Sequence, residues 1–102
     1  MAKRELTGAE MLAVMVQTVG HRRAMTMLGA AMVCGILGSE EWPAMGESLR
    51  RMGYSTAAIY KLRADFRLVG DRVEQVEGEG VGVMDLVARI RRLPDLTPGV
   101  LA

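Results

Sequence analysis

The sequence is poor in cysteine, aromatic residues and net charge, and each shortage excludes a class of protein. Cys34 is the only cysteine among 102 residues, so the chain can form neither an internal disulfide nor a multi-cysteine metal site. A lone thiol within an apolar stretch usually packs as a small hydrophobic residue, and its isolation suits a reducing compartment, so we expect a cytoplasmic protein. The formal charge of +1 excludes a polycation that coats nucleic acid along its whole length.

No stretch shows the alternation of β-branched and aromatic side chains that is typical of strands. The aromatic residues are Trp42, Tyr54, Tyr60 and Phe66, and most of the apolar content is methionine, leucine, valine and alanine. Half of the residues are hydrophobic, which is enough for a core that needs no disulfide or metal. The composition therefore predicts an all-α fold in which residues 1–102 form one helical domain.

A membrane helix is not expected, although one long stretch carries no charge. The stretch from Ala24 to Ser39 is about two residues shorter than the roughly 18 needed to span a bilayer, and it contains three glycines. The first ten residues, MAKRELTGAE, place acids where the apolar part of a signal peptide would begin, so no signal peptide is expected either. The uncharged stretch instead predicts a helix buried at the centre of a small bundle.

Two helices are expected in the N-terminal segment 8–37. Thr7 and Glu10 have the spacing of a capping box ahead of an apolar helical face, which predicts a helix over residues 8–19. Gly20 and the polar residues after it predict a break, followed by a second helix that ends by Gly38. The apolar residues that repeat at helical spacing are Met11, Leu12, Met15, Val16 and Val19 in the first helix and Met25, Leu28, Met32 and Ile36 in the second.

The segment 43–70 predicts a third and a fourth helix joined by a tight turn. Pro43 suits the first turn of the third helix, and Gly53 is expected to end it. Ser55 can cap the fourth helix by accepting a backbone N–H, and Gly70 is expected to stop that helix. The residues expected to face the core are Met45, Leu49 and Met52 in the third helix and Ile59, Leu62, Phe66 and Val69 in the fourth.

Two interpretations remain open for the region that follows Gly70. Asp71 and Glu74 again have capping-box spacing, which favours a short helix to about Glu77. Alternatively, residues 72–76 and 81–83 form two short strands, which would make a β wing over 72–83. The segment 71–94 is thus expected to hold either a short helix or a hairpin before the last helix.

The last helix is expected to start at a cap formed by Asp85 and to stop at Pro94. Its inward residues are Leu86, Ile90 and Leu93, and the tail 95–102 is expected to be loose. Together these elements predict a small bundle of five or six helices, with or without the short wing.

Residues 49–62, LRRMGYSTAAIYKL, resemble the helix-turn-helix superfamily of DNA-binding proteins. In that motif an apolar residue precedes a turn glycine, an apolar residue and a serine follow it, and the second helix buries the sixth and ninth positions after the glycine. Gly53, Ile59 and Leu62 occupy these positions here, and the resemblance extends over residues 43–66. The resemblance implies that the chain leaves one helix through a left-handed glycine and begins the next at a steep angle.

The sequence departs from the superfamily pattern at two neighbouring positions. Leu49 stands where a small residue usually allows the two helices to cross closely, and Ser48 stands where an apolar residue is usual. These departures indicate either a wider crossing or a first helix that is rotated by one residue.

The resemblance implies a role for each outward residue of the second helix. Base-facing residues would be Thr56, Ala57, Tyr60, Lys61 and Ala64, with Ser55 at the cap, and phosphate-facing residues would be Arg50, Arg51, Arg63 and Arg67. The window 46–72 favours phosphate contact because it holds six cations against three acids. The implied function is a small, sequence-specific DNA-binding transcription regulator that contacts the major groove of double-stranded DNA through the helix 56–69.

A homodimer is expected for two reasons. Few long polar side chains face the bases, so one monomer would discriminate sequences only modestly. The methionine-rich helices of 8–37 are also apolar around most of their circumference, which is more than a small monomer can bury. The candidate interface residues are Met25, Leu28, Met32 and Ile36. A symmetric dimer held there would present two recognition helices to successive major grooves.

Other functions compete with DNA binding. A helical adaptor that binds another protein through the methionine-rich face fits the near-neutral charge equally well, and a membrane-associated regulator that uses residues 24–39 comes third. An enzyme, a metal site and a cofactor are not expected. His21 lacks neighbouring metal ligands, and the glycines at 78, 80 and 82 lack the Lys-Ser/Thr ending of a phosphate loop.

Overall fold

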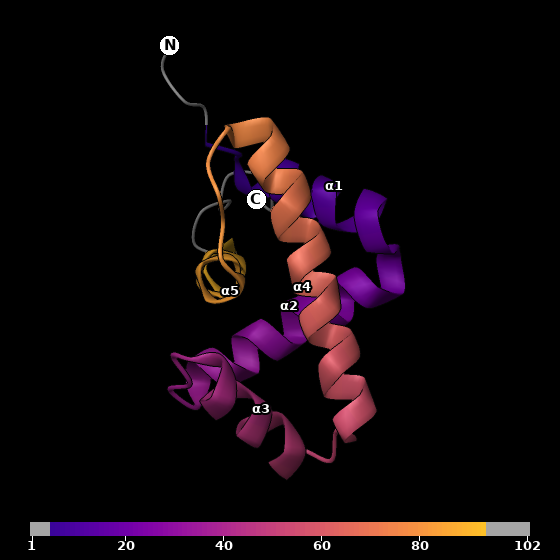
Figure 1. The fold of residues 1–102 in the computed structure, drawn as a ribbon, viewed down its shortest axis with the longest axis vertical. Helices are drawn as coiled ribbons and strands as arrows, with labels where there is room; N and C mark the ends of the chain where they lie inside the picture. Colours follow the sequence, from indigo (N-terminus) through magenta and orange to yellow (C-terminus); the bar gives the residue numbers. More distant parts are fainter. Residues whose placement is uncertain (1–4, 94–102) are drawn as a thin grey trace, which may run out of the picture.

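The computed structural model describes residues 5–93, which form helices and no strand. The helices are α1 (Gly8–Val19), α2 (His21–Ile36), α3 (Trp42–Arg51), α4 (Thr56–Glu77) and α5 (Val83–Arg91). The predicted all-α fold is confirmed. Figure 1 shows that α4 runs along most of the molecule, with α1 and α2 behind it, α5 beside it and α3 across its lower end. No helix among residues 5–93 is both long and apolar enough to cross a membrane.

The first helix begins and ends where its local signals predict, whereas α2 begins at His21, so the polar residues expected to belong to the break form its first turn. The Thr7 side chain accepts from the Glu10 backbone N–H at 3.2 Å, and the Glu10 side chain accepts from the Thr7 N–H at 3.0 Å, which completes the capping box. Gly20 has φ of 88°, a value that L side chains avoid, so α1 ends there and α2 starts in a new direction. The prediction of a helix over residues 8–19 is confirmed.

The core is built mainly from methionine and aliphatic side chains around one aromatic ring. Phe66 is fully buried, and the Trp42 ring meets its edge with centroids 6.4 Å apart. Four methionines, Met11, Met15, Met27 and Met45, are buried with it. Methionine is unbranched and flexible, so it fills the irregular spaces that helices leave when they meet at different angles.

Some residues predicted to face the core lie at the surface instead. Met52 is 45% exposed and Val16 is 37% exposed, so these two predictions were wrong. In α2 the buried face consists of Ala24, Met27, Ala30, Ala31 and Cys34, whereas Met25, Met32 and Ile36 point outward. Small residues line the inner face because α2 contacts all four other helices, which leaves little room for long side chains.

The prediction that Gly70 stops the fourth helix was wrong, because α4 continues to Glu77. Gly70 is buried in the middle of the helix, and a Cβ there would lie 3.1 Å from the carbonyl oxygen of Val81. The glycine is therefore required by the close approach of the segment before α5 and does not end the helix. Gly78, with φ of 79°, is the residue that ends α4.

Both interpretations of the region after Gly70 need correction. The β wing over 72–83 does not form, because residues 72–77 belong to α4. The alternative short helix is helical to Glu77 as expected, but it is the end of α4, and Asp71 lies inside the helix and does not cap it. A helix that is already formed needs no second nucleation, so the capping-box spacing has no effect here.

The start of α5 also differs from its prediction. Gly82 is the residue at the N-cap position, and Asp85 lies in the first turn without a capping hydrogen bond to the backbone. A carboxylate there still faces the positive end of the helix dipole, which stabilises the helix modestly. Leu86, Ile90 and Leu93 are buried as predicted. Pro94 and the tail 95–102 lie outside the described residues.

Glu77 fastens the end of α4 to two other parts of the chain. Its carboxylate accepts two hydrogen bonds from the Arg89 guanidinium, at 2.9 and 2.8 Å, and a third from the Leu6 backbone N–H at 2.8 Å. The hydrogen bonds from Arg89 hold the pKa of Glu77 below its ordinary value, and they outweigh the opposite effect of burial. The planar guanidinium suits this bidentate geometry.

We predict that this pair makes stability depend on acid pH. A lowered carboxyl pKa in the folded state contributes stability that is fully present above the ordinary pKa of 4.5 and is lost as the pH falls through the folded value. Glu77→Gln should therefore lower the melting temperature at neutral pH and lose less stability than wild type on acidification.

The matched control is Glu74→Gln, which changes an exposed carboxylate three residues earlier on the same helix. Thermal unfolding followed by circular dichroism from neutral pH to below pH 4.5 measures both variants. Equal acid sensitivity of Glu77→Gln and wild type would contradict the assignment.

Candidate nucleic-acid interface

A four-residue turn joins α3 to α4 and sets the direction of both helices. Gly53 has φ of 97°, its N–H donates to the Arg50 carbonyl at 2.9 Å, and the Tyr54 N–H donates to the Leu49 carbonyl at 3.0 Å. These two bonds form the glycine-terminated end known as a Schellman motif. A Cβ at Gly53 would meet nothing within 4 Å, so the requirement for glycine comes from the backbone angle alone.

Ser55 caps the new helix as predicted. Its hydroxyl accepts from the Ala58 N–H at 3.1 Å, which satisfies one of the free donors at the start of α4. Ile59 and Leu62 are 5% and 3% exposed, so the first turns of α4 rest on the core through the positions that the sequence indicated. The opposite side of these turns is left to solvent.

A glycine that the sequence did not single out lies where α3 faces α4. A Cβ at Gly46 would lie 3.9 Å from the Ile59 side chain, so this glycine faces α4. Leu49 is fully buried, and the Ser48 hydroxyl lies 2.8 Å from the Ser39 hydroxyl. A small residue is therefore present where the two helices face each other, but it comes three positions before Leu49.

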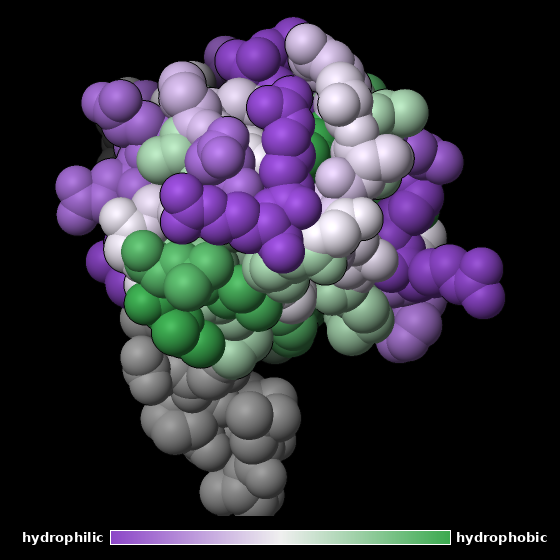
Figure 2. Space-filling model, turned by 90° about the horizontal axis from the view of Figure 1, so that it is seen from below, coloured by the Kyte–Doolittle hydropathy of each residue, from purple (hydrophilic) through white to green (hydrophobic). Residues whose placement is uncertain are grey.

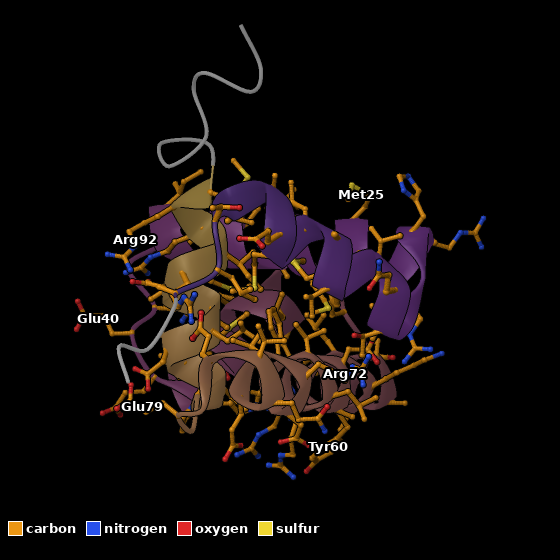
Figure 3. The ribbon with its side chains drawn as sticks, turned by 90° about the horizontal axis from the view of Figure 1, so that it is seen from above. Met25, Glu40, Tyr60, Arg72, Glu79 and Arg92 are labelled. Carbon is orange, nitrogen blue, oxygen red and sulfur yellow. The ribbon has the colours of Figure 1, made fainter. Side chains whose placement is uncertain are left out.

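The outward face of the first three turns of α4 is open to solvent. Apart from Ala58, its exposed residues are Ser55, Thr56, Ala57, Tyr60, Lys61, Ala64 and Arg67. We call these residues the α4 face. Tyr60 is 65% exposed, and Figure 3 shows it at the outer edge of the molecule, pointing away from the other helices. Within residues 5–93, neither Lys61 nor Arg67 forms an ion pair with a carboxylate.

Arg63 differs from the other cations because it packs against the protein. Its guanidinium carbon lies 5.5 Å from the centre of the Trp42 ring, in a cation–π arrangement. Its Nε is buried and has no hydrogen-bond partner among the described atoms. Arg63 therefore joins α4 to the start of α3, and its predicted contact with phosphate would compete with this packing.

Asp65 is an acid of this region that does not face solvent. It is 4% exposed and pairs with Arg23 of α2, whose Nε donates to Oδ2 at 3.0 Å and whose Nη2 donates to Oδ1. The hydrogen bond that Arg23 donates to this carboxylate raises the pKa of Arg23. Because the charge of Asp65 is neutralised inside the molecule, the α4 face is more positive than the count of residues in the sequence indicated. The two partners are 42 positions apart, and no local pattern links them.

Two further cations flank the turn. Arg50 and Arg51 are exposed in the last turn of α3. Their positive charge there also stabilises α3 by interacting with the negative end of the helix dipole. Arg50 lines a surface hollow of about 270 Å³ between α3 and α4, together with Thr56 and Tyr60 of the α4 face. Of the four cations predicted to contact phosphate, Arg50 and Arg63 line this hollow, together with the acid Glu47, whereas Arg51 and Arg67 do not line it.

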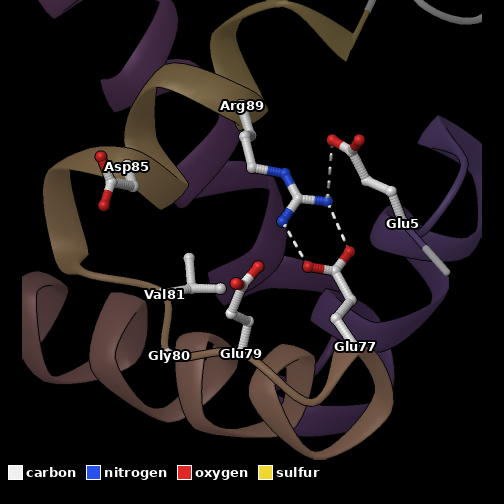
Figure 4. Close-up of a pocket in the computed structure, with 7 residues that line it drawn as sticks. All are labelled: Glu5, Glu77, Glu79, Gly80, Val81, Asp85 and Arg89. Carbon is white, nitrogen blue, oxygen red and sulfur yellow. Dashed lines mark hydrogen bonds and ion pairs between the residues drawn. The ribbon is translucent and has the colours of Figure 1, made fainter. Parts of the chain in front are cut away.

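Acidic side chains gather in a different place. Glu5, Glu77, Glu79 and Asp85 line a pocket of about 340 Å³ around Arg89, beside the end of α4 that is distant from the turn (Figure 4). Arg89 binds Glu77 directly and approaches Glu5 at 3.7 Å. No group of three or more His, Cys, Asp or Glu side chains among residues 5–93 is arranged to hold a metal ion. The pocket is therefore an ion-pair cluster, and its acids lie at the end of α4 that is distant from the α4 face.

Comparison with known proteins gives no relative, because no family model, no curated protein and no solved structure matches the chain. The resemblance to the helix-turn-helix superfamily therefore depends on the residues of 43–66 and on the geometry of the turn. Function has to be inferred from these features.

We predict that Gly53→Ala destabilises the protein by about 1 kcal/mol or more, because the left-handed angle disfavours any Cβ. The matched control is Gly46→Ala in the same pair of helices, where a Cβ makes an ordinary contact and a better helix former adds about 0.5–1 kcal/mol. Urea unfolding should show changes of opposite sign. A neutral Gly53→Ala variant would contradict the role of the turn.

We also predict that two neighbouring cations differ in their effect on stability. Arg63→Ala should lose about 1 kcal/mol, because the contact with Trp42 and the packing of the side-chain stem are both removed. Lys61→Ala should stay within about 0.5 kcal/mol of wild type, since its side chain is exposed. Chemical unfolding followed by circular dichroism measures the difference, and equal stabilities would show that the stacking contributes nothing.

Proposed function

We propose that the protein is a small, sequence-specific transcription regulator that binds double-stranded DNA through the α4 face. The observation that carries this proposal is the exposed start of α4, which follows a glycine turn and a serine cap and presents two unpaired cations. An α-helix fits the major groove of B-form DNA, and the first turns of a second helix are the part that enters it in helix-turn-helix proteins.

The residues of the α4 face have complementary properties. Lys61 and Arg67 can contact phosphates, and Thr56 and Tyr60 carry hydroxyl groups that can donate to or accept from base edges. Ala57 and Ala64 are small and leave the helix backbone free to approach the groove. The free N–H groups at the start of α4 add a positive dipole that favours phosphate.

The arrangement of charge also supports contact with DNA. Arg50 and Arg51 lie on α3 beside the turn, and the acid nearest to the α4 face in sequence, Asp65, is buried and paired. The acidic pocket lies at the other end of α4. Phosphate contact releases counterions, so a local cationic region can bind DNA even though the whole chain is almost neutral.

The second candidate function is a helical adaptor that binds another protein. The observation that favours it is the apolar outer face of α2, where Met25 is 39% exposed, Met32 is 41% exposed and Ile36 is 82% exposed. The predicted homodimer would use the same residues, together with Leu28, which is half-buried. An adaptor would bind its partner with no dependence on the cations of the α4 face.

We predict that replacing Lys61 and Arg67 together by Ala weakens binding to duplex DNA and leaves the fold intact. Each lost phosphate contact should reduce the slope of log affinity against log salt by about one, because one fewer counterion is released. Fluorescence anisotropy at several salt concentrations measures this slope. The matched control is Arg92→Ala, since Arg92 is exposed on the C-terminal side of α5, far from Tyr60 (Figure 3).

A second pair of variants separates base contact from phosphate contact. Tyr60→Ala and Thr56→Ala should reduce the preference for a selected site over random DNA and hardly change the salt slope, because base contacts release few counterions. A wild-type protein without salt-sensitive affinity for any duplex would refute DNA binding and favour the adaptor.

A further inference from the structure

One apolar face of α2 remains uncovered. Met25, Gly29, Met32 and Ile36 follow one another at helical spacing along it, and all four residues are exposed. We call them the α2 stripe. The neighbouring Leu37 is 56% exposed, and Figure 2 shows hydrophobic side chains gathered in one surface patch at the lower end of the molecule. Exposed apolar surface of this kind on a small protein is typical of sites that bind another protein.

A cation lies at the N-terminal end of the α2 stripe, and two acids follow its C-terminal end, where Arg91 also lines the surface. Arg22 is exposed at its N-terminal end, and Glu40 and Glu41 are exposed just after its C-terminal end. Within residues 5–93, none of the three forms an ion pair. A second copy of α2 that runs antiparallel would place its arginine beside these glutamates, and the same pairing would occur again at the other end. The charges therefore favour a second copy of this chain as the occupant of the stripe.

The shape of the surface fits the same pairing. Gly29 lies in the middle of the α2 stripe, and a Cβ there would meet nothing within 4 Å, so a second helix can approach closely. A hollow of about 440 Å³ lined by Met32, Gly35, Ile36 and Arg91 continues the stripe at its C-terminal end. An antiparallel copy that aligns Arg22 with Glu40 brings its own Met25 to this hollow.

The position of the α2 stripe decides where the DNA-binding surfaces of a dimer point. Figure 3 shows Met25 and Tyr60 on opposite sides of the molecule, so the α2 stripe and the α4 face look in opposite directions. The two-fold axis of a symmetric dimer lies in the plane of its interface, and it reverses any direction perpendicular to that plane. The two α4 faces of such a dimer therefore point away from each other.

We propose that two copies pack antiparallel through the α2 stripe and that the dimer holds two separate DNA segments, one on each outer side. This inference rests on the proposed function of the α4 face. It replaces the expectation that a dimer presents two recognition helices to successive grooves of one duplex, because that arrangement needs both α4 faces on the same side of the dimer.

The antiparallel pairing can be tested by exchanging charges. Arg22→Glu, and separately Glu40→Arg with Glu41→Arg, should each weaken the dimer about tenfold or more, because like charges then face each other. All three substitutions in one chain should restore the dimer, since each charge again meets its opposite. Sedimentation equilibrium measures the association constant, and circular dichroism verifies that each variant folds. A wild-type monomer at about 100 μM, or no restoration by the triple variant, would overturn the pairing.

The bridging of DNA is tested with one biotinylated duplex on beads and one fluorescent duplex in solution. Wild-type protein should retain the fluorescent duplex on the beads. Met32→Lys should bind each duplex in anisotropy measurements but retain none, because it disrupts the dimer and leaves the α4 face intact. The matched control Val76→Lys changes another exposed apolar residue, 51% exposed on α4, and should bridge as wild type does.

The outcomes distinguish the inference from the proposed function. A dimer that binds a single duplex and never retains a second one would overturn the bridging arrangement and leave DNA binding in place. A dimer that binds no DNA at all would overturn both bridging and the proposed function, while sedimentation still decides the antiparallel pairing. Bridging by Met32→Lys at wild-type strength would show that the α2 stripe is not involved.

Discussion

The burial of one continuous face of α4 is the constraint on which the rest of the structure depends. Ile59, Leu62, Phe66, Val69 and Val73 lie on that face, and all four other helices contact α4. Complete burial of an aliphatic or aromatic side chain contributes about 1.5–3 kcal/mol, so five such residues on one helix contribute a large part of the stability of a small domain. The helix can be this long because Gly70 admits the segment before α5 without interrupting the hydrogen bonds of the helix.

Burial of that face also determines which side chains of α4 are available for function. Because one face of α4 is directed to the core, the opposite face lies in solvent. In its N-terminal half this exposed face holds Tyr60, Lys61 and Arg67. Two specific contacts sharpen the separation. Asp65 is buried and paired with Arg23, and Arg63 lies on the Trp42 ring, so Lys61 and Arg67 are the exposed charges of the α4 face. The same arrangement places the outer face of α2 on the opposite side, where Met25 and Met32 are exposed.

The local signals in the sequence were sufficient for most helix boundaries. The capping box at Thr7, the positive-φ turn at Gly53 and the cap at Ser55 each act within about four residues, and backbone hydrogen bonding over such a distance does not depend on the fold. The stripe of α4 was also readable, because its apolar residues recur at helical spacing. These features were sufficient to predict the all-α fold, the turn between α3 and α4, and the exposed face on which the proposed function rests.

Only the tertiary structure decided the features that join distant parts of the chain. The sequence indicated that Gly70 would end a helix, because glycine is common at helix ends. The structure shows that glycine is needed there because the Val81 carbonyl approaches it closely. The pairs Arg23–Asp65 and Arg89–Glu77 join different helices, so periodicity along one helix could not reveal them. The apolar residues of α2 could not be divided into inner and outer faces by hydrophobicity, since both faces are apolar. Packing puts Met27 and the alanines inside and Met25 and Met32 outside. The sequence by itself determines where most helices begin, where the chain turns and which helices have an apolar side, because these features depend on neighbouring residues. Close packing determines which apolar side is buried and in which direction each remaining face points.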